Sequence, residues 1–207
     1  MKYEKKPRIL ITSGEPAGIG PDLIVKLAQI DHQIDLTIVG DPEVFIERAK
    51  HLSLPLKFHT ITDTNISQDS YKPNSLKLIP VKLSVPCSPG KLNKLNAHYV
   101  LELLDIASRE CLFKNYDAIV TAPIQKSIIN DAGINFSGHT EYFAKRCGGM
   151  LPVMLLNCSK LRVALVTTHL ALRDVPDSIT TERVEKTIRI VIDEMKNKFG
   201  IKRPRIT

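Results

Sequence analysis

The chain has 207 residues, of which 43% are hydrophobic and 25% charged, a balance typical of a soluble globular protein. It has no apolar run of about eighteen residues or more that could cross a membrane, and the apolar run near the N-terminus is too short for a secretory signal, so we expect a cytoplasmic protein with no membrane partner. The net charge of +7 comes from basic residues spread along a chain with few aromatics, which argues against a nucleic-acid partner and is compatible with an anionic substrate.

Apolar runs typical of strands alternate along the chain with helical patterns. Strands are predicted at 8–12, 35–40, 54–61, 75–83, 116–123, 150–158 and 161–170, and helices at 20–30, 42–52, 93–113 and 178–200. The polar segment 62–75 has no strong pattern. Because strands that alternate with helices form βαβ units, we expect a largely parallel or mixed sheet.

The helix predicted at 178–200 has the clearest signals. Thr180 is suited to the N-cap position, and one apolar stripe follows it at three- and four-residue steps: Val184, Ile188, Val191, Met195 and Phe199. The last residues, "RIT", resemble the start of another strand. We therefore expect that a C-terminal part of the sheet is missing from this chain.

A glycine-rich turn joins the first predicted strand to the first predicted helix in "ITSGEPAGIGPDLIVKLA" (11–28). Gly14, Gly18 and Gly20 permit positive φ and close approach of the backbone, and Pro21 suits the first turn of the helix. Free N–H groups at such a helix start can bind an anion. The spacing is neither G-x-G-x-x-G nor a P-loop, so a structural turn and a ligand loop stay equally open.

The segment "INDAGINFSGHTEYFA" (129–144) places His139 and Thr140 side by side at a predicted helix start. Their side chains offer hydrogen-bond donors and acceptors for a phosphate or a hydroxyl group. The structural alternative is that Thr140 only caps the helix and His139 lies on the surface. Taken alone, these residues favour that alternative, because capping threonines are common.

Two further polar residues follow predicted strands. His169 in "LRVALVTTHLALRDVPDSIT" (161–180) comes at a strand end, where open α/β sheets place ligand sites, although a single His in a loop makes no metal site. Lys126 in "VTAPIQKSIINDAG" (120–133) follows the preceding strand and could meet an anionic group, or could be a solvated helix residue.

Together these four motifs resemble, in order, those of the 4-hydroxythreonine-4-phosphate dehydrogenase family, and "GEPAGIGPDL" also resembles the "GDGIGPE" turn of the isocitrate and isopropylmalate dehydrogenases. The resemblance implies an isocitrate/isopropylmalate dehydrogenase-like three-layer α/β/α fold with a parallel or mixed sheet. It implies two lobes, at about 1–120 and 121–207, with the C-terminal part missing. Family members continue with "NPHAGE" and "MYHDQG" segments that this chain lacks.

The resemblance also assigns roles to residues. It implies that His139 and Thr140 contact the substrate and that His169 is one of three histidines that ligate a divalent metal (Zn, Mg or Co). The catalytic residue stays unknown, and Lys126 is a second-tier candidate for that role. Candidate cofactor contacts in the glycine-rich turn are Glu15, Gly18 and Ile19.

The activity implied is the oxidation of 4-phosphooxy-L-threonine at C3 by NAD or NADP, in pyridoxine 5′-phosphate biosynthesis. The product, 2-amino-3-oxo-4-(phosphooxy)butanoate, is a β-keto acid that loses CO2 to give 3-amino-2-oxopropyl phosphate. The family also implies a homodimer with shared active sites. Because two of three metal ligands are missing, we expect the 207-residue chain alone to be inactive. The alternatives are a non-catalytic folded fragment and a dehydrogenase of another phosphorylated hydroxy acid.

Overall fold

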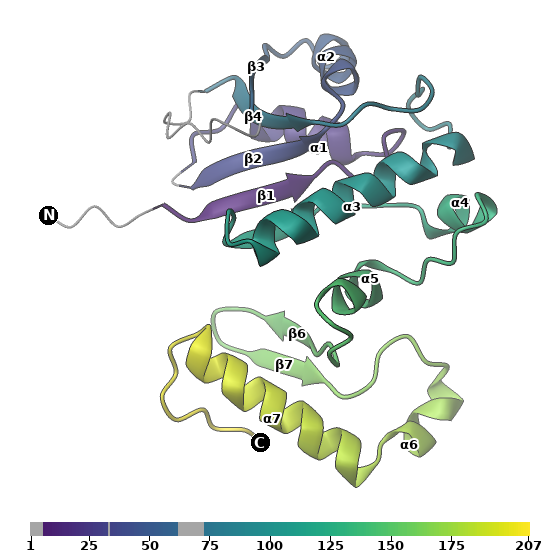
Figure 1. Cartoon of the computed structure of the whole chain (residues 1–207). Coiled ribbons are helices and arrows are strands. Elements are labelled where there is room, and N and C mark those ends of the chain that lie inside the picture. Colours follow the sequence, from purple (N-terminus) through teal and green to yellow (C-terminus); the bar gives the residue numbers. More distant parts are fainter. Residues whose placement is uncertain (1–5, 33, 62–72) are drawn as a thin grey trace, which may run out of the picture. The chain divides into compact units, whose positions relative to one another are not determined.

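The computed structural model describes residues 6–32, 34–61 and 73–207. The chain divides into two compact units, Met1–Cys147 and Gly148–Thr207, which Figure 1 colours from purple to green and from green to yellow. The predicted lobes, with their boundary near residue 120, stay a prediction. The boundary between the two compact units falls after Cys147, because the segment after residue 121 packs into the first core through Ile129 and Phe136.

The first unit contains a five-stranded sheet in the order β3-β4-β2-β1-β5, and each neighbouring pair of strands is parallel (Figure 1). Its strands are β1 (Arg8–Thr12), β2 (Asp35–Gly40), β3 (Lys57–Thr60), β4 (Ser75–Pro80) and β5 (Ala118–Thr121). Sequence analysis predicted all five. The predicted loop 62–75 lies, up to residue 72, outside the described residues.

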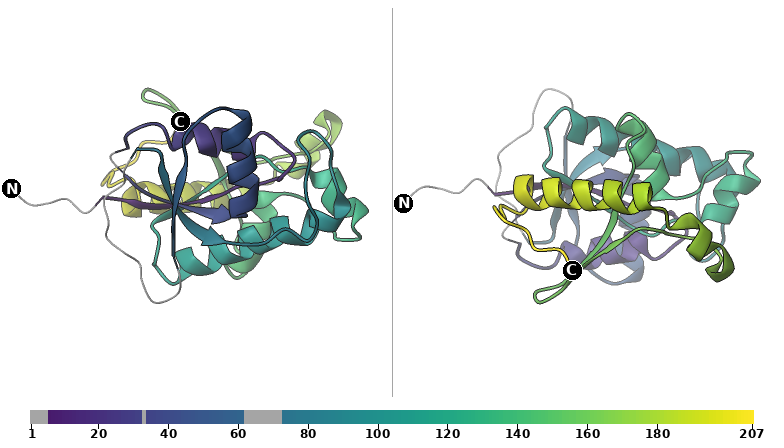
Figure 2. Two further views of the ribbon diagram at one scale, coloured as in Figure 1. Left: turned by 90° about the horizontal axis from the view of Figure 1, so that it is seen from above. Right: turned by 90° about the horizontal axis from the view of Figure 1, so that it is seen from below.

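Helices cover both faces of this sheet and make three layers, as expected. Helices α1 (Gly20–Leu27) and α2 (Pro42–His51) pack on the face that carries Ile11 and Ile38. The short 3-10 helix η1 (Lys94–Asn96) leads into α3 (Ala97–Leu112), which packs on the face that carries Leu10 and Val39. Figure 2 shows the sheet with its helices from above and from below. The alternation of side chains along each strand thus divides the core into two clusters.

Local sequence signals explain where these helices form. In α2, Asp41 is the N-cap, and its Oδ1 atom accepts a 2.8 Å hydrogen bond from the Glu43 N–H group, with Pro42 at the first helical position. In α3, the fully buried residues recur at steps of three and four: Val100, Leu103, Leu104 and Ala107. Two further helices, α4 (Lys126–Asp131) and α5 (His139–Arg146), follow β5.

The second unit consists of an antiparallel hairpin and helices. Strand β6 (Met154–Asn157) pairs with β7 (Arg162–Leu165), and η2 (Leu172–Asp174) and α6 (Val175–Ser178) lead to α7 (Thr181–Asn197). Thr180 caps α7 as predicted, since its Oγ1 atom accepts a 3.2 Å hydrogen bond from the Arg183 N–H group. The predicted stripe of α7 is only partly covered: Met195 is buried, whereas Ile188 and Phe199 are 36% and 41% exposed.

No helix in the described part of the chain is long and apolar enough to cross a membrane. The prediction that the strand at 161–170 reaches His169 is wrong, because β7 ends at Leu165 and the residues after it form a loop. Helices α4 and α6 were not predicted from the sequence.

Candidate functional site

The carboxyl ends of β1 and β5 meet in the first unit at the point where the chain order of the sheet reverses. The chain builds β2 and β4 on one side of β1 and then returns to add β5 on the other. The Glu15 N–H group donates a 2.9 Å hydrogen bond to the Pro123 carbonyl oxygen, and the Ala122 N–H group donates to the Thr12 carbonyl oxygen at 3.0 Å. Open α/β sheets bind their ligands at such a reversal.

Gly14 allows these two strand ends to approach. Its φ is 73°, and a Cβ atom built there would lie 2.4 Å from the Pro123 carbonyl oxygen. Gly18 and Gly20 do not have positive φ, so this part of the prediction holds for Gly14 alone. The space beside Gly14 is filled by the chain itself, which supports the structural interpretation of the glycine-rich turn.

The candidate cofactor residues of this turn bond mainly to the turn itself. The buried Glu15 carboxylate accepts a 3.1 Å hydrogen bond from the Ala17 N–H group, and burial raises the pKa of this carboxyl above its ordinary value. The Gly18 N–H group donates to the Glu15 carbonyl oxygen at 3.0 Å, and Ile19 is 59% exposed. These contacts do not form a cradle for a nicotinamide cofactor, so we derive no reaction step through one.

Lys126, Gly138 and His139 meet a short distance beyond the β5 end. Lys126 begins α4, and His139 begins α5. Gly138 joins them: its φ is 154°, and a Cβ atom there would lie 3.2 Å from the Lys126 Nζ atom and 3.0 Å from a Glu141 carboxylate oxygen. The φ of 154° favours glycine here, and a side chain at this position would press against the ends of both charged side chains.

His139 is half-buried between aromatic rings. Its ring is edge-on to Phe136 at 6.4 Å and stacked on Phe143 at 6.2 Å, measured between centroids. Its Nε2 atom is buried and has no hydrogen-bond partner among the described residues. Burial and, to a lesser degree, the charge of Lys126 lower the pKa of His139 below its ordinary value, so the ring is neutral at neutral pH. A buried polar atom without a protein partner needs one from a ligand or an ordered water molecule, which makes this atom a candidate ligand contact.

Thr140 does not cap α5. The N-cap is Gly138, and no side chain caps the first N–H groups of this helix. Thr140 therefore lies inside the first turn, beside the positive end of the helix dipole. The structural alternative is therefore wrong for Thr140, which is not the cap, whereas His139 is half-buried and neither fully exposed nor fully enclosed.

His169 lies in the second unit, in the loop after β7. It is exposed, and its φ of 56° is unusual for a residue with a side chain. In the described part of the chain no three His, Cys, Asp or Glu side chains gather into a group that could hold a metal ion. These residues therefore do not fit a complete metal site, and we derive no step through a metal.

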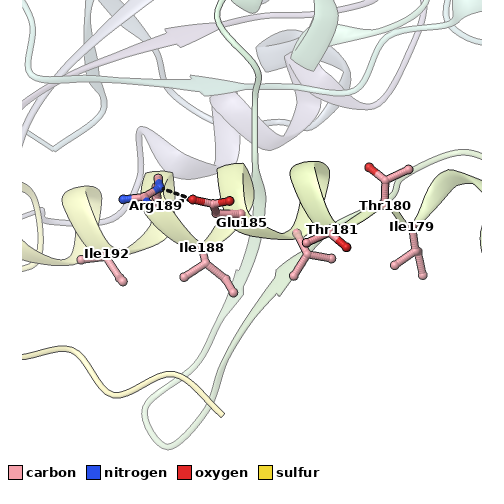
Figure 3. A pocket seen from close by; sticks show the side chains of 8 residues that line it. Ile179, Thr180, Thr181, Glu185, Ile188, Arg189 and Ile192 are labelled. Carbon is pink, nitrogen blue, oxygen red and sulfur yellow. Dashed lines mark hydrogen bonds and ion pairs between the residues drawn. The ribbon is translucent and has the colours of Figure 1, made fainter.

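The second unit also has an open groove along α7 (Figure 3). Its lining is mostly apolar, and Ile179, Ile188 and Ile192 point to one side of the helix in that view. Its two charged residues pair with each other, since Arg189 Nη2 lies 2.6 Å from Glu185 Oε1. Both charged side chains that line the groove are thus already paired, so we place the candidate site in the first unit.

Two tyrosines with polar contacts in the first unit were not predicted from the sequence. Tyr142 follows the quoted "GHTE", and its hydroxyl donates to the carboxylate of Asp105 on α3. Tyr99 on α3 forms a 2.9 Å hydrogen bond with the hydroxyl of Ser13, the residue that follows β1. The only advance signal was position: Tyr142 lies one helical turn after His139.

Comparison with known proteins agrees with the motifs. A family model described as pyridoxal phosphate biosynthetic protein PdxA matches residues 32–207. The chain belongs to this family. It is 48% identical over 199 residues to a 4-hydroxythreonine-4-phosphate dehydrogenase of Colwellia psychrerythraea, and this match covers 96% of the chain and 61% of that protein. It is 44% identical over 200 residues to the enzyme of the same name from Methylococcus capsulatus, covering 97% of the chain and 60% of that protein.

Solved structures give the same result for the PdxA fold. The crystal structure of 4-hydroxythreonine-4-phosphate dehydrogenase from Klebsiella pneumoniae matches with a TM-score of 0.88 at 28% identity, covering 99% of this chain and 62% of that one. The enzyme from Burkholderia phymatum matches with a TM-score of 0.85 at 28% identity, covering 98% and 62%. This chain therefore spans about 60% of the length of the curated relatives that it matches.

Proposed function

We propose that this protein acts as a 4-hydroxythreonine-4-phosphate dehydrogenase in pyridoxine 5′-phosphate biosynthesis. The substrate would be 4-phosphooxy-L-threonine, oxidised at C3 by NAD or NADP, and the β-keto acid product would lose CO2. The observation that carries the proposal is the buried Nε2 atom of His139, which has no partner among the described residues and lies in the segment that resembles the family's substrate-binding motif.

The residues of the first unit suit an anionic, hydroxylated substrate. The Lys126 ammonium supplies positive charge beside His139, and the uncapped N–H groups at the start of α5 add donors. The neutral His139 ring offers Nε2 to one group of the substrate, and Thr140 adds a hydroxyl. These groups would bind and orient the substrate, the role in which a rigid site contributes most to rate.

By resemblance, the family uses NAD or NADP and a divalent metal (Zn, Mg or Co); a bound nicotinamide would supply a hydride acceptor and a bound metal a Lewis acid, and the described residues complete a site for neither. Neither is needed for the binding role assigned to Lys126, His139 and Thr140. His169 would be this chain's one metal ligand. A cytoplasmic homodimer with shared active sites is part of the same proposal, and it rests on the resemblance alone.

The test is an NMR titration of the 207-residue chain with 4-phosphooxy-L-threonine, because NMR also detects weak binding. We expect the ring resonances of His139 and the amide of Thr140 to shift, and Lys126→Met to weaken the effect. L-Threonine, which lacks the phosphate, is the control and should give no shift. No response to the phosphorylated substrate, or an equal response to threonine, would overturn the proposal.

The same titration with a phosphorylated hydroxy acid that lacks the amino group tests the alternative, a dehydrogenase of another phosphorylated hydroxy acid. If it shifts His139 at lower concentration than 4-phosphooxy-L-threonine does, the chain belongs with dehydrogenases of that other substrate class.

A further inference from the structure

Helix α5 carries the candidate substrate residues but has little to hold it in place. None of its residues is buried, and its N-cap, Gly138, provides no side-chain hydrogen bond. A short, uncapped helix has low stability by itself, so tertiary contacts must fix the position of His139. Tyr142 and Phe143 are partly buried against the first core, and the polar contacts that join α5 to α3 come from Tyr142 and Arg146.

The Tyr142 hydroxyl joins α5 to α3. It donates a hydrogen bond to the Asp105 carboxylate, and Arg146 Nη2 donates to the same hydroxyl oxygen at 3.2 Å. Arg146 also forms an ion pair with Asp105 and lies over the Tyr142 ring, with its Cζ atom 5.4 Å from the ring centroid. We call Asp105, Tyr142 and Arg146 the α3–α5 clamp.

Within the clamp, the hydrogen bond from the Tyr142 hydroxyl to the Asp105 carboxylate contributes most to holding the two helices together. The side chains of Asp105 and Arg146 are 40% and 48% exposed, and exposed ion pairs contribute little. Burial and the hydrogen bond to Asp105 raise the pKa of Tyr142 to about 12, so the hydroxyl stays protonated and keeps donating at every physiological pH. A hydrogen bond from a hydroxyl group to a charged carboxylate is stronger than a hydrogen bond between two neutral groups.

Ring contacts connect the clamp to His139. The Tyr142 ring contacts Phe136 at 5.8 Å and Phe143 at 6.1 Å between centroids. The same two phenylalanines enclose the His139 ring, one edge-on and one stacked. His139 also lies one turn before Tyr142 on the same helix. A shift of Tyr142 must therefore move the rings that bury His139.

We propose that the α3–α5 clamp positions His139, by holding α5 against α3 so that the imidazole stays between Phe136 and Phe143 with its Nε2 atom buried. The three clamp residues are positioning residues and do not touch the substrate. This inference rests on the proposed function in so far as His139 is the substrate contact. The burial of His139 does not depend on that function and is tested separately.

The test measures the pKa and ring resonances of His139 by NMR in the 207-residue chain, with the signal assigned by its loss in His139→Gln. Tyr142→Phe keeps the ring and removes only the hydroxyl, and Asp105→Asn removes the charged acceptor. Burial is the main cause of the low pKa, so both variants should raise the pKa of His139 toward its ordinary value and change its ring shifts. The charged neighbours Lys126 on α4 and Glu141 on α5 are unchanged in both.

Glu102→Gln is the matched control, because it removes an exposed carboxylate one turn earlier on α3. It should leave the His139 pKa unchanged, and Asp105→Glu should restore part of the wild-type value. Arg146→Gln gives a second clamp variant that removes only a half-exposed side chain, should another variant fail to fold. An unchanged His139 pKa in folded Tyr142→Phe and Arg146→Gln, or an equal change in Glu102→Gln, would overturn the proposal.

Titration with 4-phosphooxy-L-threonine separates the two proposals. If the wild-type chain responds, Tyr142→Phe should bind about tenfold more weakly, because a displaced His139 loses its hydrogen bond to the substrate. Equal affinity in the two proteins would overturn the positioning role. If the wild-type chain does not respond, the proposed function fails, and a raised His139 pKa in the clamp variants would still support the clamp.

Discussion

Replacing Gly14 by alanine tests the closest backbone contact of the candidate site. An alanine at φ 73° costs about 1–2 kcal/mol of backbone strain. Its Cβ atom would also lie 2.4 Å from the Pro123 carbonyl oxygen, a backbone atom held by a hydrogen bond from the Glu15 N–H group. Relieving such an overlap costs about 1–3 kcal/mol more, so Gly14→Ala should lower the free energy of unfolding by about 2–5 kcal/mol.

Gly133→Ala is the matched control. Gly133 has a similar φ of 83°, but no atom lies within 4 Å of a Cβ atom built there. This variant should lose only the strain, about 1–2 kcal/mol.

Urea unfolding followed by tyrosine fluorescence measures both variants. The chain has no Trp, none of its five Tyr residues falls between positions 148 and 207, and the described ones (Tyr99, Tyr116 and Tyr142) belong to the first unit, so the signal follows that unit. If Gly14→Ala is destabilised no more than Gly133→Ala, the close approach of the two strand ends is not what requires this glycine.

Three further predictions concern single side chains. Tyr99→Phe should lower the unfolding free energy by about 1–3 kcal/mol in the same assay, because the buried Asp41 N–H group, which donates to the Tyr99 hydroxyl at 3.1 Å, loses its partner. The pKa of His139 is lowered by folding, so the unfolded chain binds the extra proton; stability should fall as the pH drops below about 6.5, and His139→Gln should show a smaller fall. Calorimetry should detect no stoichiometric binding of Zn2+ or Co2+ to the 207-residue chain, with or without the change His169→Gln, and metal-dependent turnover should be absent. Stoichiometric binding that His169→Gln abolishes would contradict this prediction.

The parallel sheet could be predicted because its central strands are short apolar runs between breakers. The runs at 8–12 and 35–40 became β1 and β2 without a change of bounds. Helices α4 and α6, with six and four residues, are too short to show a helical period. Tertiary contacts determine such helices: α4 is fixed by Ile129, which is fully buried in the first core.

The candidate site was predicted residue by residue but not as an arrangement. The motifs pointed to Lys126 and His139, yet only the turn at Gly138 shows that these side chains are neighbours. The burial of the His139 Nε2 atom depends on two phenylalanine rings and has no sequence signal. Asp105 reaches the site from α3, more than thirty positions earlier, which no local pattern could indicate.

The place of β1 between β2 and β5 has a consequence for the order of assembly during synthesis. Arg8, at the start of β1, bonds to Asp117, which lies 109 positions later. The pairing of β1 with β2 needs only neighbouring segments, so that part of the sheet can form while the chain is still being made. One edge of β1 must then wait for β5 to leave the ribosome. The contact of Gly14 with Pro123, and the candidate substrate residues that follow it in the chain, are therefore assembled late in the folding of the first unit.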